Sequence, residues 1–295
     1  DQDARQAVKA GSKISVEGPV GKKTFRLKGT RKVVETLLDC ADRYNEPAEV
    51  DGNRATAGLN VATEPDDLHT FEGGQQAFDM GQYALAQTRW TGAAAKGDHR
   101  AALALGLELK SGTYVAADET MAVALFRQAA EAGSAEGRYW YGRALETGSG
   151  TEKNLAQAWK ELGKAAADGY VPAQTHIGYL LDNGIGRAAE PAAAAQWYAA
   201  AAENGDAEAQ YLYGRAFRDG RGVEASEPSA LYWFDRAAVQ GNGQAQFALA
   251  RLLSKEVRDD ALEEIYLWYR LAANRGIAEA EGRLDELKSK VRRSK

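Results

Sequence analysis

A single cysteine, Cys40, stands among the 295 residues, and one thiol excludes any disulfide within this sequence. Its place on the apolar side of an expected short helix favours a buried structural role over a nucleophile, although it could pair with a cysteine outside these residues. Histidine is also scarce. His69, His99 and His176 lack the spacing of a metal-binding pair such as H-E-x-x-H. We therefore expect no metal site, no cofactor and no enzyme activity.

Long apolar runs are missing too, since none approaches the roughly 20 residues that a membrane helix needs. The net charge of −5 supplies no positive field for nucleic acid or anionic lipid, and no platform of aromatic and basic residues is present. The sequence starts at Asp1 without a signal peptide, so we expect an excised fragment or a processed chain.

Glycine, in contrast, recurs at a fixed period. One register consists of Gly97, Gly133, Gly169, Gly205, Gly241 and Gly276, and all its intervals are 36 residues except the last, which is 35. A second register consists of Gly106, Gly142, Gly178 and Gly214, with Ala250 in the fifth place. A period in this range indicates a solenoid of stacked helix pairs, which offers an extended binding surface rather than a catalytic pocket.

Each repeat has the pattern of two helices joined by a turn. In Ala135–Glu146 the apolar residues fall at helical spacing, and the glycine-bearing turn Gly148–Lys153 follows. The expected N-caps of the second helices are Asp118, Asn154, Glu190 and Ser226. The second helices carry an aromatic pair or its substitute and end in Ala-Ala-x-x-Gly, where small residues allow close packing and glycine permits a left-handed turn.

These motifs resemble the Sel1-like repeat family. Residues Ala207–Gly241 carry Ala207, Ala209, Tyr213-Gly214, Phe217, Gly220-x-Gly222-Val223, Ala230, Trp233-Phe234, Ala237-Ala238 and Gly241, in the order of that family's pattern. The likeness extends from about Asp98 to Gly276. It implies an all-α, right-handed α-solenoid of helix-turn-helix repeats and a role as an adaptor for other proteins.

Three parts are expected along the chain. Residues 1–45 read as a small α+β fragment, with strands at Ser12–Glu17 and Lys23–Lys28 and a helix from Thr30 to about Tyr44. Residues 46–66 read as a linker, and 67–295 as the solenoid of about six helix pairs and a charged capping helix. The first pair looks more like a tetratricopeptide repeat. The run from Phe25 to Cys40 resembles the end of some secreted proteobacterial domains.

Candidate binding residues follow from the second glycine register. Positions two before and one after each glycine share a helix face, and their variable residues form a stripe with an aromatic centre and three arginines. The members chosen as partner-binding are Trp140, Arg143, His176, Tyr179, Leu212, Arg215 and Arg251. An alternative is that these residues pack between neighbouring first helices, with the arginines paired to Glu136, Glu146 or Glu208. The sequence does not show which of the two rows faces outward.

The leading hypothesis is a non-catalytic scaffold that binds a protein or an extended peptide on the concave face of the solenoid. The alternative is a cell-wall ligand binder, with a link to peptidoglycan, or an envelope enzyme, for which no nucleophile with a base is visible. The family resemblance favours a periplasmic or secreted bacterial protein, and the cytoplasm stays open.

Overall fold

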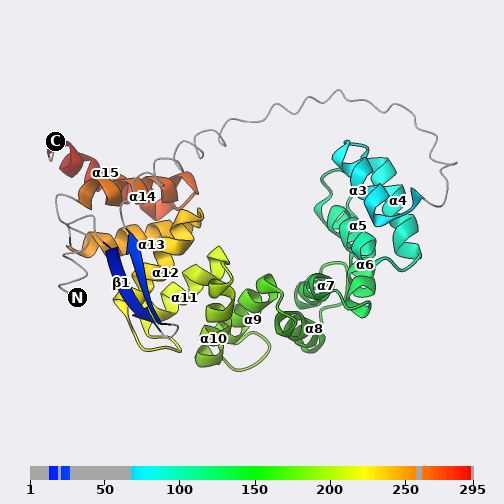
Figure 1. The fold of residues 1–295 in the computed structure, drawn as a ribbon, viewed down its shortest axis with the longest axis horizontal. Coiled ribbons are helices and arrows are strands. Elements are labelled where there is room, and N and C mark those ends of the chain that lie inside the picture. The colour runs from blue at the N-terminus through cyan, green and yellow to red at the C-terminus, as the bar shows by residue number, and fades with distance from the viewer. Residues whose placement is uncertain (1–12, 19–20, 27–67, 257–260, 294–295) are drawn as a thin grey trace. The chain divides into compact units, whose positions relative to one another are not determined.

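The structure is a computed structural model that describes residues 13–18, 21–26, 68–256 and 261–293 (Figure 1). The chain divides into two compact units. Residues 51–189 form one, here called the 51–189 unit. Residues 190–295 form the other together with residues 1–50, and it is here called the 190–295 unit.

Helices fill the described part of the 51–189 unit, and each packs on the next along the chain (Figure 1). They are α3 (Phe71–Asp79), α4 (Tyr83–Ala95), α5 (His99–Ser111), α6 (Glu119–Glu131), α7 (Ala135–Thr147), α8 (Leu155–Ala167) and α9 (Val171–Asn183).

The 190–295 unit continues the same order of packing. Its helices are α10 (Pro191–Glu203), α11 (Ala207–Asp219), α12 (Glu227–Val239), α13 (Gly243–Leu253), α14 (Leu262–Asn274) and α15 (Ala278–Arg293), with a short 3₁₀ helix, η4 (Ser254–Glu256), after α13. The described residues thus hold 13 α-helices, which agrees with the predicted six pairs and a final helix.

The expected strands are confirmed with shifted ends. Strand β1 (Lys13–Gly18) pairs antiparallel with β2 (Gly21–Arg26), and Ile14 lies opposite Phe25. The expected helix from Thr30, the linker 46–66 and Cys40 lie outside the described residues.

Side-chain caps start the second helices as the sequence predicts, with one exception. Asp118, Asn154 and Ser226 each accept a hydrogen bond from the backbone N–H three residues further on. Glu190 makes no such bond, and α10 begins instead with Pro191, whose fixed φ suits a first helical position.

Glycine allows the two helices of a repeat to approach closely. A Cβ added at Gly142 would lie 2.7 Å from Leu162 of α8, and one added at Gly214 would lie 2.7 Å from Phe234 of α12. Any larger residue would therefore separate the pair. The glycines that end the second helices, such as Gly205, have positive φ, which confirms the predicted left-handed turns.

A row of buried glutamines was not recognised in the sequence although it has the same period of 36. Gln174, Gln210 and Gln246 each donate an amide N–H to the carbonyl of Ala166, Ala202 or Ala238 at the end of the preceding second helix. Each of these carbonyls also accepts the backbone N–H of the glycine that follows the helix, so the glutamine adds a second hydrogen bond there and ties consecutive repeats together.

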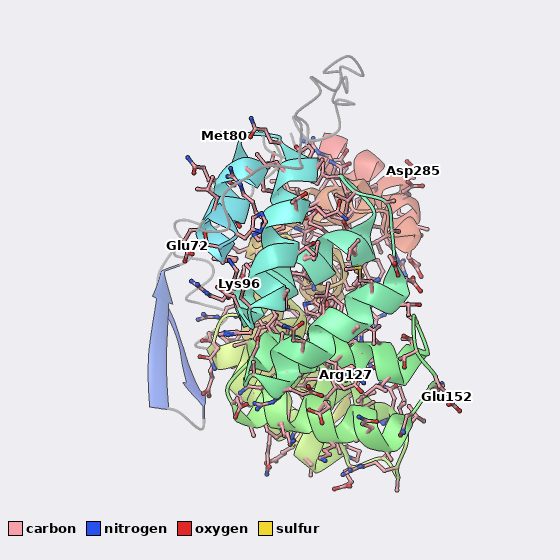
Figure 2. All side chains as sticks on the ribbon, turned by 90° about the vertical axis from the view of Figure 1, so that its right-hand side faces the viewer. Glu72, Met80, Lys96, Arg127, Glu152 and Asp285 are labelled. Atoms are coloured by element: carbon pink, nitrogen blue, oxygen red, sulfur yellow. The ribbon has the colours of Figure 1, made fainter. Side chains whose placement is uncertain are left out.

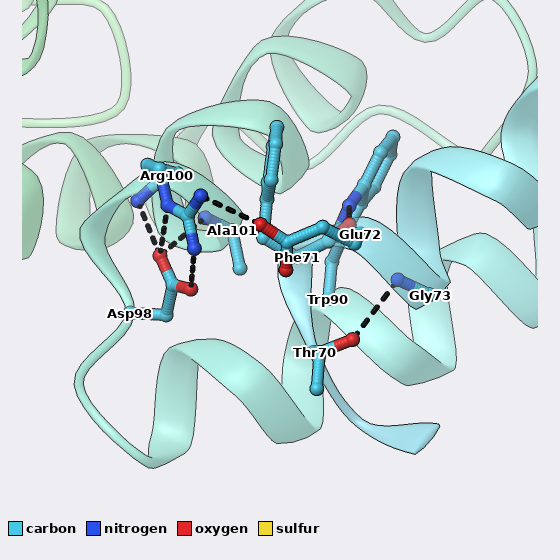
Figure 3. Close-up of polar contacts among 8 residues, drawn as sticks. All are labelled: Thr70, Phe71, Glu72, Gly73, Trp90, Asp98, Arg100 and Ala101. Atoms are coloured by element: carbon cyan, nitrogen blue, oxygen red, sulfur yellow. Dashed lines mark hydrogen bonds and ion pairs between the residues drawn. The ribbon is translucent and has the colours of Figure 1, made fainter. Parts of the chain in front are cut away.

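Helix α3 is linked to α5 by an ion pair (Figure 3). The guanidinium of Arg100 donates to Asp98, the N-cap of α5, at 2.9 Å and to Glu72 of α3 at 2.7 Å, and it lies over the Phe71 ring. Thr70 caps α3 through the N–H of Gly73.

At the other end, α15 packs on α14. Trp268 and Leu271 of α14 are buried, as are Ala280 and Leu287 of α15. The final helix therefore adds to the apolar core of the last repeat.

Candidate partner-binding surfaces on the first helices

The first helices of the repeats are α5, α7 and α9 in the 51–189 unit and α11 and α13 in the 190–295 unit. The residue after each register glycine is half-buried or exposed: Leu107, Arg143, Tyr179, Arg215 and Arg251. The row two residues before the glycine is less accessible. Leu212 is only 7% exposed, and Ala248 is buried. The row after the glycine is therefore the more accessible of the two in α9, α11 and α13, and we call it the outward row. Leu212 offers a partner little surface.

In the 51–189 unit, Trp140 is held on three sides. Its indole ring stacks on Phe126 with a centroid distance of 6.1 Å, and the ammonium group of Lys110 lies 4.7 Å from its centroid. The indole N–H points to Glu136 at 3.4 Å. Contact with a cation and a neighbouring ring fixes the orientation of this aromatic group.

Arg143 and His176 meet at one carboxylate, although they belong to different helices. Glu146 of α7 lies 2.6 Å from Nε2 of His176 on α9 and 3.3 Å from Nε of Arg143. Arg143 also donates to the Tyr139 hydroxyl at 3.2 Å, and the His176 ring stacks on Tyr179. Arg143 thus pairs with Glu146, which is one of the alternatives left open by the sequence.

The pKa of Glu146 reports the balance at this position. Burial raises it, but the hydrogen bond from His176 and the positive charges of Arg143 and Lys153 outweigh burial and lower the pKa. We call Trp140, Arg143, Glu146, His176 and Tyr179 the α7–α9 cluster. Within it every described charge has an opposite charge beside it.

In the 190–295 unit, the equivalent positions hold arginines that have no carboxylate partner among the residues described by the structure. Arg215 of α11 lies over the ring of Tyr211, 5.8 Å from its centroid, and Arg251 of α13 is exposed. One turn beyond Arg215, Arg218 donates two hydrogen bonds to Asp219, at 2.7 and 2.8 Å. We call these five residues the α11–α13 face.

The described residues contain no group of three histidine, cysteine or carboxylate residues placed to hold a metal ion. Among the same residues, no helix is both long and apolar enough to cross a membrane.

The Sel1 repeat family model matches residues 99–134, 135–170, 171–206, 207–242 and 266–277, which together are more than half of the chain. The chain belongs to the Sel1 repeat family. Sel1 repeats generally bind other proteins. The unmatched stretch between 242 and 266 includes Lys255–Asp260, where the sequence has no counterpart of the glycine-bearing turns of the other repeats.

Two solved structures of this family resemble the chain. A Sel1 repeat protein from Oxalobacter formigenes is 27% identical with a TM-score of 0.64, and the match covers 71% of this chain and 88% of that one. The protein c5321 of uropathogenic Escherichia coli, described as a protective antigen with an SLR fold, is 26% identical with a TM-score of 0.63. That match covers 97% of this chain but only 58% of c5321, so this chain spans less than two thirds of its length. No curated protein sequence matches significantly.

Proposed function

We propose that this Sel1 repeat protein is a non-catalytic scaffold that binds a protein or peptide partner through the outward faces of its first helices. The observation that carries this proposal is the difference between the repeat framework and the outward row. Glycine, alanine and glutamine recur with the period of the repeat at the positions where helices pack on each other. The outward row varies from repeat to repeat, and its residues are Leu107, Arg143, Tyr179, Arg215 and Arg251. Positions that the fold leaves unspecified are where partner choice resides.

The α7–α9 cluster supports this role through its composition and its rigidity. Trp, Tyr and Arg are the residue types that dominate binding energy at interfaces. Tyr179 is 43% exposed, and the rings of Trp140 and His176 are fixed by stacking, so little side-chain entropy is lost when a partner binds.

The test begins with a partner recovered by crosslinking from the native host and confirmed with purified components. Trp140→Ala combined with Arg143→Ala should weaken binding by about 10- to 100-fold if both act as hot-spot residues. Arg127→Ala is the matched control, because this residue lies on the exposed side of α6 (Figure 2). Binding is compared under conditions where the variants are fully folded, and a loss of binding that disappears there, or an equal loss in the control, argues against this surface.

The bacterial envelope is the proposed location. The resemblance of Phe25–Cys40 to secreted domains supports it, as does the description of c5321 as a protective antigen. A signal peptide in the complete gene and recovery in the periplasmic or secreted fraction would agree with this location. Recovery in the cytosolic fraction would contradict it. Soluble muropeptides added to the binding assay test the link with peptidoglycan, because a wall ligand would compete with the protein partner.

A further inference from the structure

The α11–α13 face has more positive than negative charge. Its only described carboxylate, Asp219, is engaged by Arg218 through two hydrogen bonds. Among the residues that the structure describes, Arg215 and Arg251 have no carboxylate within ion-pairing distance. Three guanidinium groups therefore face one carboxylate in a chain whose net charge is −5, so the excess of positive charge is local.

The positive charges of all three arginines act on the carboxylate of Asp219. The hydrogen bond from Arg218 is the largest cause of the lowered pKa of Asp219, burial opposes it, and the positive charges of Arg218, Arg215 and Arg251 lower the pKa further. Arg215 of α11 and Arg251 of α13 occupy the same position of consecutive first helices, 36 residues apart, and Arg218 lies one turn beyond Arg215 on α11. An added negative charge at this position would relieve their mutual repulsion.

Aromatic contacts fix the helix segments that carry Arg215 and Arg251. The Tyr211 ring beneath Arg215 packs against Phe234, at a centroid distance of 5.9 Å. On α13, Phe247 lies one turn before Arg251 and packs edge-on against Tyr269, with the centroids 5.7 Å apart. Positive groups on fixed helices lose less freedom on binding than groups on a loop.

Carboxylate is the anion whose geometry the face already displays. Arg218 holds Asp219 through Nε and Nη2, the two-point arrangement in which guanidinium recognises a carboxylate. At the opposite end of α11, Glu208 accepts a hydrogen bond from Asn242 at 2.9 Å, which places a negative charge at that end of the helix. This charge disfavours a continuous polyanion, such as nucleic acid, that would run along the whole helix.

We propose that the α11–α13 face binds an acidic segment of the partner protein, with carboxylates of that segment paired to Arg215 and Arg251. The inference rests on the proposed scaffold function and specifies the chemistry of the partner. Because exposed ion pairs are individually weak, the segment needs several acidic residues and its affinity falls as salt rises.

A fluorescein-labelled oligoglutamate peptide provides the probe, and an oligoglutamine peptide of equal length is its control. Fluorescence anisotropy with the full chain should show binding of oligoglutamate alone, weakening as sodium chloride is added. Arg215→Gln with Arg251→Gln should weaken it about tenfold, the combined effect of two ion pairs. Arg127→Gln with Arg283→Gln is matched in net charge, since both arginines are exposed on α6 and α15, and should change it less than twofold.

Each other outcome overturns the inference. Equal weakening by both double variants shows that only net charge matters. A phosphopeptide or an oligonucleotide that binds more tightly than oligoglutamate, through the same two arginines, shows that phosphate is the ligand. If oligoglutamate fails to bind while the protein partner still depends on Trp140 and Arg143, the inference fails and the scaffold function stands. If neither Trp140→Ala with Arg143→Ala nor Arg215→Gln with Arg251→Gln weakens binding of the protein partner, the first helices are not its binding surface, and the scaffold proposal is contradicted together with the inference.

Discussion

Arginines at equivalent positions of the first helices have different surroundings in the two units. In the 51–189 unit, Arg143 finds Glu146, and Glu146 also binds His176. In the 190–295 unit, Arg215 and Arg251 occupy the same repeat positions without a carboxylate partner among the described residues. The first helices α7, α9, α11 and α13 follow the same repeat, so this difference comes from the side chains at their variable positions.

Partly buried carboxylates sharpen this contrast. Glu146 has a lowered pKa because its cationic partners outweigh burial. Asp235 of α12 has its pKa raised to about 6, because burial dominates and the neighbouring Glu264 adds repulsion that the charge of Arg236 only partly offsets. Burial also raises the pKa of Glu264, although the indole N–H of Trp268 donates a hydrogen bond to this carboxylate at 3.5 Å and partly lowers the pKa. Glu146 is therefore stabilised as an anion, whereas Asp235 and Glu264 are disfavoured as anions.

The largest expected effect comes from Asp235→Asn. The folded pKa of Asp235 lies above its ordinary value of 3.8, so the folded state binds the extra proton between these pH values. The contribution of Asp235 to stability should therefore fall as pH rises from about 4 to 6 and stay low above that range. Removing the charge should raise the free energy of unfolding at pH 8 by about 2 to 3 kcal/mol, and by little at pH 4.

Urea denaturation at pH 4 and pH 8 measures this gain, with Glu152→Gln as the control. Glu152 is exposed in the turn after α7, as Figure 2 shows, and its substitution should leave stability unchanged at both pH values. A variant of Asp235 that is less stable than the wild type at pH 8 would show that this carboxylate is compensated by a partner.

A smaller effect of opposite sign is expected for Glu146→Gln. The pKa of Glu146 is lower in the folded state than its ordinary value of 4.5. The charged carboxylate therefore contributes to the free energy of unfolding above pH 4.5, and this contribution is lost as the pH falls through the pKa of the folded state. Loss of the charged hydrogen bond to His176 should destabilise the chain by about 1 to 2 kcal/mol at pH 7 and by less at pH 3. Hydrogen exchange in peptides from α7 and α9 would locate the change.

Glu131→Gln is the matched control for Glu146. Glu131 is exposed on α6, 3.8 Å from Arg127, and an exposed pair of this kind contributes about 0 to 1 kcal/mol. If both variants lose the same stability at pH 7, the special position of Glu146 between α7 and α9 has no energetic consequence.

The helices and their caps were largely predictable, because residues with the same structural role recur with the period of the repeat. Asp118, Asn154 and Ser226 were expected as caps from their period and type, and the structure shows all three capping. The glutamine row had the same period and was missed. Glutamine has no fixed structural role in a helix, and its bond to the preceding repeat becomes visible only when the helices are packed.

The candidate surface was less predictable, because its properties arise between helices. The pairing of Glu146 with His176 joins residues 30 positions apart. Neither the helix periodicity nor the cap signals indicate that their side chains meet. The same applies to Leu212 and Trp140, which share a repeat position. Leu212 is buried and Trp140 is half-buried.

The smallest expected effect on stability is that of Arg215→Gln combined with Arg251→Gln. Neither guanidinium has an ion pair to lose among the described residues, and relief of the repulsion with Arg218 offsets the lost attraction to Asp219. The free energy of unfolding should therefore change by less than about 0.5 kcal/mol. Arg143→Gln, which loses contacts to Glu146 and Tyr139, should lower it by about 1 kcal/mol in the same urea titration. Equal losses would mean that the arginines of both units serve the fold. A loss confined to Arg143 would leave Arg215 and Arg251 with no structural task, as expected of residues kept for a partner.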